Sequence, residues 1–253
     1  MQHETPENQP APLPRPPRRG IYLLPNLFTT AALFSGFYAI LAAMDGRFTM
    51  AAIAIFVAMV LDGLDGRVAR MTNTQSAFGA EYDSLSDMVA FGLAPALVMY
   101  AWALQDLGKP GWFAAFVYTA AAALRLARFN TQVTSADKRY FQGLPSPAAA
   151  AILASGVWVS IDHHLDPSSI AWFAAALTLI TGLLMVSNLR YHSFKEIDPR
   201  GRIPFIVLVV VMLGFAIVLW NPSLVLFLLF LGYATSGPLL TLIELRRRRR
   251  QRG

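Results

Sequence analysis

The sequence DGLDGRVARMTNTQSAFGAEYDSLSD, residues 62–87, sets four aspartates into otherwise strongly apolar surroundings. Asp62 and Asp65 are three residues apart, and Asp83 and Asp87 are four apart. On helices, each pair would therefore lie on one face. The polar stretch between the pairs is typical of a turn. The segment predicts two antiparallel helices whose aspartates meet at one end of a helical hairpin.

The rest of the chain has the composition of an integral membrane protein. Hydrophobic residues make up 55% and charged residues 14% of the sequence, whereas soluble domains are about 25% charged. Apolar stretches compatible with spans of roughly 17–25 residues fall at 27–44, 48–70, 79–104, 111–128, 147–160, 168–187, 204–220 and 224–243. We therefore expect an all-α integral membrane protein, a single bundle of about eight transmembrane helices within residues 21–244.

The basic residues predict how this bundle is oriented. With the N-terminus cytoplasmic, only Arg47 and Lys109 of the 21 Lys and Arg residues fall in outer loops. Residues 1–20 are polar and Pro-rich and are expected to be disordered. Residues 245–253 are expected to form a basic cytoplasmic tail on anionic lipid headgroups. The net charge of +6 then requires no nucleic-acid partner.

The acidic segment also predicts a kind of chemistry. Converging carboxylates repel one another unless cations bind, and oxygen ligands suit Mg²⁺, Mn²⁺ or Ca²⁺. Small residues, including Gly66, Ala69 and Gly79, are interleaved with the aspartates. They are compatible with close helix packing or with a bare surface for a bulky anionic ligand, with Arg70 at a phosphate. The neighbouring aspartates favour the ligand surface.

The spacing Asp62-x2-Asp65-Gly66-x2-Ala69-Arg70-x8-Gly79-x3-Asp83-x3-Asp87 resembles the signature of the CDP-alcohol phosphotransferase family at all eight fixed positions. The resemblance implies a six-helix membrane core, here followed by two further C-terminal helices, and usually a homodimer. It implies a reaction in which an alcohol displaces CMP from a CDP-linked lipid. Two divalent cations, Mg²⁺ or Mn²⁺, are implied as cofactors.

The resemblance also implies roles for individual residues. Asp62, Asp65 and Asp83 would hold the metals, while Asp87 would bind one metal and accept the proton of the incoming hydroxyl. Contacts to CDP-diacylglycerol are implied for Asn26, Thr29, Gly66, Ala69, Arg70, Ser76 and Gly79. Residues 25–29, PNLFT, resemble the family's first-helix segment, although they are equally compatible with an ordinary helix start in which Pro25 and Asn26 are breaker and cap.

Four segments together resemble the membrane-integral phosphatidylserine synthases of bacteria: GIYLLPNLFTTAALFSGFYAI at 20–40, LRLARFN at 124–130, GLPSPAA at 143–149 and VSNLRYHSFK at 186–195. This resemblance implies L-serine as the acceptor and the bacterial inner membrane as the location, with the active site cytoplasmic. The carboxylate of serine needs a polar, cationic pocket, for which the candidates are Arg125, Arg128, Asn130 and Ser146. Both arginines could equally be anchors at the membrane surface.

Two other functions remain open on the sequence. The same reaction could use another acceptor, such as glycerol 3-phosphate or inositol phosphate. A cation-coupled transporter would also carry intramembrane aspartates. A transporter is expected to place them near the bilayer midplane on broken helices, whereas these lie at helix ends beside a short turn. That position favours an enzyme.

Overall fold

The computed structural model describes residues 23–72, 74, 76–132, 140–192 and 205–252, and this part of the chain is helical apart from two short strands. The elements, in chain order, are α1 (Leu23–Met44), α2 (Phe48–Thr72), α3 (Ala77–Asp87), η2 (Met88–Leu93), α4 (Ala94–Met99), η3 (Tyr100–Leu104), η4 (Gln105–Leu107), α5 (Lys109–Gln132), β1 (Tyr140–Gln142), α6 (Ser146–Asp162), α7 (Pro167–Val186), β2 (Arg190–His192), α8 (Phe205–Trp220) and α9 (Pro222–Arg252).

The predicted multi-pass helical fold is confirmed. Each apolar stretch of the sequence falls on a helix, and the third falls on the continuous run from α3 to η4. Among the described helical segments, five are long and apolar enough to cross a membrane: Pro25–Met44, Phe48–Thr72, Ala77–Leu107, Pro167–Val186 and Pro222–Thr241. Helices α6 and α8 are apolar but shorter. The predicted tail at 1–20 lies outside the described residues, and α9 continues as a helix through Arg252.

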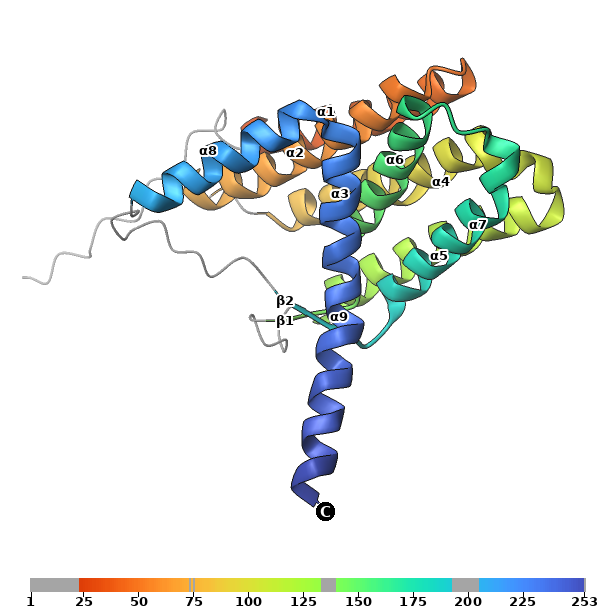
Figure 1. Cartoon of the computed structure of the whole chain (residues 1–253). Helices are drawn as coiled ribbons and strands as arrows, with labels where there is room; N and C mark the ends of the chain where they lie inside the picture. The colour runs from red at the N-terminus through yellow and green to blue at the C-terminus, as the bar shows by residue number, and fades with distance from the viewer. Residues whose placement is uncertain (1–22, 73, 75, 133–139, 193–204, 253) are drawn as a thin grey trace, which may run out of the picture.

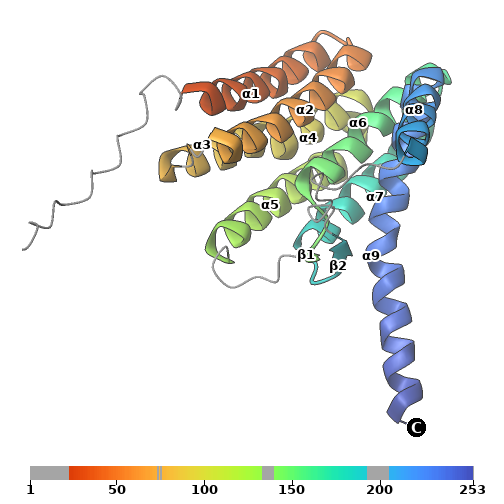
Figure 2. The ribbon, with the colours of Figure 1, turned by 90° about the vertical axis from the view of Figure 1, so that its left-hand side faces the viewer.

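Helix α6 lies in the interior of the bundle, with most of its residues buried. Helix α1 packs along α2, α5 packs along α7, and α6 contacts α2, α4 and α9 (Figures 1 and 2). Four alanines of α6, Ala149, Ala150, Ala151 and Ala154, are completely buried. Because alanine adds little width to a helix, neighbouring helices can approach the backbone of α6 closely. Helix α9 is the longest helix of the described chain and extends past the bundle (Figure 1).

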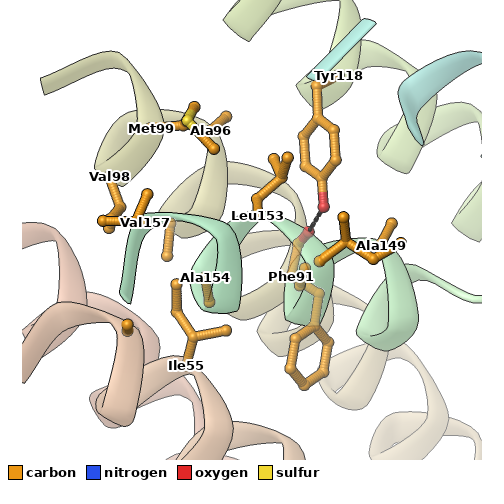
Figure 3. Close-up of a cluster of buried hydrophobic side chains, with 14 of the residues drawn as sticks. Ile55, Phe91, Ala96, Val98, Met99, Tyr118, Ala149, Leu153, Ala154 and Val157 are labelled. Atoms are coloured by element: carbon orange, nitrogen blue, oxygen red, sulfur yellow. Dashed lines mark hydrogen bonds between the residues drawn. The ribbon is translucent and has the colours of Figure 1, made fainter. Parts of the chain in front are cut away.

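Larger side chains fill the space between these helices. Ile55 of α2, Phe91 of η2 and Leu153 of α6 are completely buried in one cluster (Figure 3). Tyr118 of α5 is also completely buried there, and its hydroxyl donates a hydrogen bond to the carbonyl oxygen of Phe91 at 3.1 Å. The cluster joins α2, η2, α5 and α6 into one core.

The two strands pair at the end of the bundle where α5 ends and α6 begins. Strand β1 is antiparallel to β2, with Phe141 opposite Tyr191. Tyr191 is completely buried and donates its hydroxyl to the carbonyl of Ala234 in α9 at 3.0 Å. These strands were not predicted from the sequence, because three residues are too few to show an alternating pattern. Through Tyr191 of β2, the strand pair is attached to α9.

Candidate active site

Three carboxylates converge between α2 and α3, away from the turn that joins the two helices. Asp62 lies on α2, and Asp83 and Asp87 lie on α3. One carboxyl oxygen from each lies within 4.8 Å of the other two. Ser76 starts α3 by accepting a hydrogen bond from the Gly79 amide at 3.0 Å, an N-cap interaction that fixes where the helix begins. The predicted hairpin with facing aspartates is therefore present.

The fourth aspartate is held by the first helix. Asp65 is buried, and its Oδ2 accepts a hydrogen bond from the Thr29 hydroxyl at 2.7 Å. Its carboxyl group also lies close to that of Asp83. Ser86 of α3 donates to the Thr29 carbonyl at 3.0 Å, so α1, α2 and α3 are joined at one point. The family resemblance implies Thr29 as a substrate contact, and this stays a prediction; in the structure its hydroxyl donates to Asp65.

Two glycines, Gly66 of α2 and Gly79 of α3, lie on the helices that carry the carboxylates. A Cβ atom at Gly79 would lie 3.1 Å from Ser76 Oγ and 3.6 Å from Asn26 Oδ1. A Cβ atom at Gly66 would lie 3.7 Å from Arg70 Nη1. The structure thus brings Asn26, Ser76 and Gly79 together and keeps Arg70 beside Gly66. Asn26 lies within α1, which already includes Leu23, so the alternative interpretation of Asn26 as a helix cap is not supported.

A half-buried arginine, Arg125, lies on α5, which packs against η2 directly after Asp87. The Nη1 atom of Arg125, on α5, donates to the hydroxyl of Ser146 at 2.8 Å, and Ser146 is the completely buried first residue of α6. Within the described part of the chain, the buried Nε of Arg125 has no hydrogen-bond partner. The positive charge of Arg125 acts on the Asp87 carboxyl. Two of the four predicted acceptor residues, Arg125 and Ser146, are therefore in direct contact beside the acidic cluster.

The other two predicted acceptor residues contact different elements. Arg128 Nη2 donates to Asn188 Oδ1 at 2.8 Å and to Gln142 Oε1 at 2.5 Å. Asn130 Nδ2 donates to the Ser84 hydroxyl of α3 at 3.0 Å. Sequence reasoning did not single out Gln142, Asn188 or Ser84 as side chains of the site. Asn188 falls within a segment that carried the resemblance, but nothing in the sequence indicates that its amide would meet Arg128.

Together, an oxygen-only acidic cluster, two glycines on its helices and a half-buried arginine on α5 define a site suited to a phosphate-linked ligand at one end of a membrane bundle. A model of the CDP-alcohol phosphatidyltransferase family matches residues 22–186, which include all four aspartates. The chain belongs to this family. The expectation drawn from the spacing of the signature is confirmed.

Individual relatives extend the similarity beyond the signature. The chain is 38% identical over 199 residues to the CDP-diacylglycerol–serine O-phosphatidyltransferase of Helicobacter pylori strain ATCC 700392 / 26695, covering 79% of this chain and 84% of the relative. The protein of the same name from Mycobacterium bovis is 32% identical over 229 residues, with 87% and 79% covered. The archaetidylserine synthase of Methanothermobacter thermautotrophicus is 33% identical over 180 residues, with 70% and 72% covered.

Proposed function

We propose that this protein transfers the phosphatidyl group of CDP-diacylglycerol to L-serine, giving phosphatidylserine and CMP. The observation that carries the proposal is the cluster of Asp62, Asp83 and Asp87, whose oxygens lie within 4.8 Å of one another on helices that also carry Gly66 and Gly79. The names of the relatives support serine as the acceptor and CDP-diacylglycerol as the donor.

The residues of the cluster fit divalent cations. The donors are all carboxylate oxygens, which suit Mg²⁺ or Mn²⁺. Asp83 Oδ1 is buried and has no hydrogen-bond partner among the described residues, so it is available to a ligand. Asp62, Asp65, Asp83 and Asp87 would hold two such ions. When bound, they supply positive charge that neutralises the pyrophosphate and stabilises the departing CMP.

The reaction is a direct displacement at phosphorus. The serine hydroxyl oxygen forms a bond to the phosphorus that carries diacylglycerol, and the bond from that phosphorus to the oxygen of CMP breaks. Asp87 accepts the hydroxyl proton, as a carboxylate general base within reach of the nucleophile. The side chains of Asn26, Ser76 and Arg70, with the bare surface at Gly66, Ala69 and Gly79, hold the CDP group. One displacement inverts the configuration at phosphorus, and retention in a chiral substrate would contradict it.

The serine acceptor would be bound by residues on and beside α5. Arg125 donates to Ser146 on a helix that packs against η2, directly after Asp87, and its guanidinium would bind the carboxylate of serine while the serine hydroxyl approaches the base. Arg128 and Asn130 lie near the same end of α5 and would supply the other polar side chains of the acceptor pocket. This arrangement suits an amino-acid acceptor that is itself anionic.

We further propose that the protein lies in the bacterial inner membrane with the active site and both termini cytoplasmic. The distribution of Lys and Arg supports this orientation. Residues 21–244 would form the catalytic domain, the basic segment at 245–253 would contact anionic headgroups, and the protein would act as a homodimer.

The proposed function is tested by CMP release from the purified protein in lipid nanodiscs that contain CDP-diacylglycerol. The acceptors compared are L-serine, glycerol 3-phosphate and inositol phosphate, each with Mg²⁺, with Mn²⁺ and with excess chelator. We expect release with serine and divalent metal, and none with chelator. CMP release with glycerol 3-phosphate or inositol phosphate instead of serine would show that the protein uses a different acceptor. Uptake of serine or metal by proteoliposomes without CMP release would support a transporter.

The general base is tested with a neighbouring control on the same helix. We expect Asp87→Asn to lower kcat by about 10³-fold or more, since general-base assistance contributes about 10²–10⁴-fold. Glu81→Gln removes an exposed carboxylate six residues earlier in α3 and should leave kcat unchanged. Equal activity of the two variants would exclude Asp87 as the base.

A further inference from the structure

The helix that carries Asp83 and Asp87 changes its hydrogen-bond pattern directly after Asp87. Residues Met88–Leu93 form the wider turns of a π-helix, η2, before the α-helical pattern resumes at Ala94. Pro95 explains the change. It has no N–H to donate to the carbonyl four residues earlier, which is that of Phe91, and its ring would collide with that carbonyl in a regular α-helix.

Tyr118 of α5 provides a donor to that carbonyl. Its side chain is completely buried, and its hydroxyl lies 3.1 Å from the Phe91 carbonyl oxygen (Figure 3). Four residues further along α5, the Ala122 methyl group lies against the backbone of η2, since a Cβ atom at Gly92 would be only 3.2 Å from it. Tyr118 and Ala122 therefore fix the position of α5 along η2 and the distance between the two helices.

The same face of α5 carries Arg125. Tyr118, Ala122 and Arg125 follow one another at intervals of four and three residues, the spacing of one helical face. Asp87, in turn, lies one turn before Phe91 on the helix that receives the Tyr118 hydroxyl. One hydrogen bond thus connects the helix segment after the proposed base to the helix that carries the proposed acceptor cation.

We propose that Tyr118 is a positioning residue, whose hydrogen bond to the Phe91 carbonyl sets the location of the Arg125 guanidinium relative to Asp87. This inference rests on the proposed function, because it concerns how the serine carboxylate and the serine hydroxyl are presented to the two residues. Tyr118 itself contacts no reacting atom. Its hydroxyl acts by holding α5 at one register on a helix whose regular hydrogen bonding is interrupted by Pro95.

The test compares the wild-type protein with Tyr118→Phe, which keeps the buried ring and removes only the hydroxyl. We expect kcat to fall about tenfold and the serine KM to rise about fivefold, because small displacements of reacting groups reduce rates steeply. The KM for CDP-diacylglycerol should change less than about twofold, since its proposed contacts lie on α1, α2 and α3.

A matched variant separates positioning from general loss of stability. Thr178→Val removes another completely buried hydroxyl, which donates to the Ala174 carbonyl of its own helix α7 at 2.7 Å. Both variants should lower the melting temperature in nanodiscs. Only Tyr118→Phe should alter kcat and the serine KM below that temperature.

A double variant tests whether Tyr118 acts through Arg125. Arg125→Lys keeps a positive charge but has no planar fork to orient, so adding Tyr118→Phe to Arg125→Lys should change kcat and the serine KM less than about twofold. The inference would be overturned if Tyr118→Phe had its full effect in the Arg125→Lys protein, or if Tyr118→Phe alone left the kinetics of a serine-using enzyme unchanged. Wild-type protein without serine-dependent CMP release would instead overturn the proposed function, and this inference with it.

Discussion

The hydrogen bond between Thr29 and Asp65 leads to a quantitative prediction about metal binding. Thr29→Val replaces the hydroxyl by a methyl group of nearly the same size and leaves the buried Asp65 Oδ2 without this donor. A hydrogen bond to a charged group contributes about 1.5–3 kcal/mol, and about 1.4 kcal/mol corresponds to a tenfold change in binding. Loss of the contact should therefore weaken the metal site about 10- to 100-fold, in the range found for groups that orient metal ligands.

The assay is CMP release as a function of Mn²⁺ concentration, with saturating serine and CDP-diacylglycerol. We expect Thr29→Val to raise the half-saturating Mn²⁺ concentration by about 10- to 100-fold. Thr29→Ser, which keeps the hydroxyl, should restore most of the affinity. Ser35→Ala provides a control on the same helix, because the Ser35 hydroxyl donates to the Ala31 carbonyl at 2.9 Å and not to the site.

Two results would refute this reasoning. An unchanged half-saturating Mn²⁺ concentration in Thr29→Val would show that the hydroxyl does not support the metal site. An equal increase in Ser35→Ala would show that any lost hydroxyl on α1 has the same effect. If instead the KM for CDP-diacylglycerol rises while the metal dependence is unchanged, Thr29 contacts the nucleotide, as the sequence resemblance implied.

Two further variants test the acceptor side and the attachment of α9. Arg128→Ala should raise the serine KM about tenfold through loss of a charged contact and leave the KM for CDP-diacylglycerol unchanged. The control is Arg67→Ala, on the exposed surface of α2. An equal rise of the serine KM in both variants would exclude Arg128 from the pocket. Gly237→Ala places a Cβ atom 2.4 Å from the Tyr191 ring, so overpacking should lower the free energy of unfolding by about 1–3 kcal/mol, measured as a lower melting temperature. Gly232→Ala, on the same helix with open space around its Cβ position, should not destabilise the protein, and a comparable loss there would assign the effect to α9 in general.

Much of the site could be predicted from residues 62–87 because its chemistry is local in sequence. The three- and four-residue spacings place each pair of aspartates on one helical face. The polar turn reverses the chain, so the two pairs must meet. Hydropathy located the helices around them, since each membrane span must satisfy its backbone hydrogen bonds within its own helix. The irregular course of the third helix was not predicted, although Pro95 marks the position in the sequence.

The remaining contacts could not be predicted because they join residues that are distant in the chain. Thr29 and Asp65 lie on different helices, and nothing in either local pattern indicates that one hydroxyl would orient one carboxylate. Arg125 and Arg128 look equivalent in the sequence, yet one contacts Ser146 and the other contacts Gln142 and Asn188. Their difference follows from the paired strands and from the depth of each position in the bundle.

A helical membrane protein, an acidic hairpin and membership of a family that works on CDP-linked lipids could all be predicted from the amino-acid sequence. These properties depend on composition and short-range spacing, which a helix converts directly into geometry. The packing of the helices was needed to show that Thr29 contacts Asp65, that Arg125 contacts Ser146 and that Tyr118 holds α5 against η2. Each of these depends on how separate helices pack, because the positions of their side chains relative to one another are fixed only when the core closes.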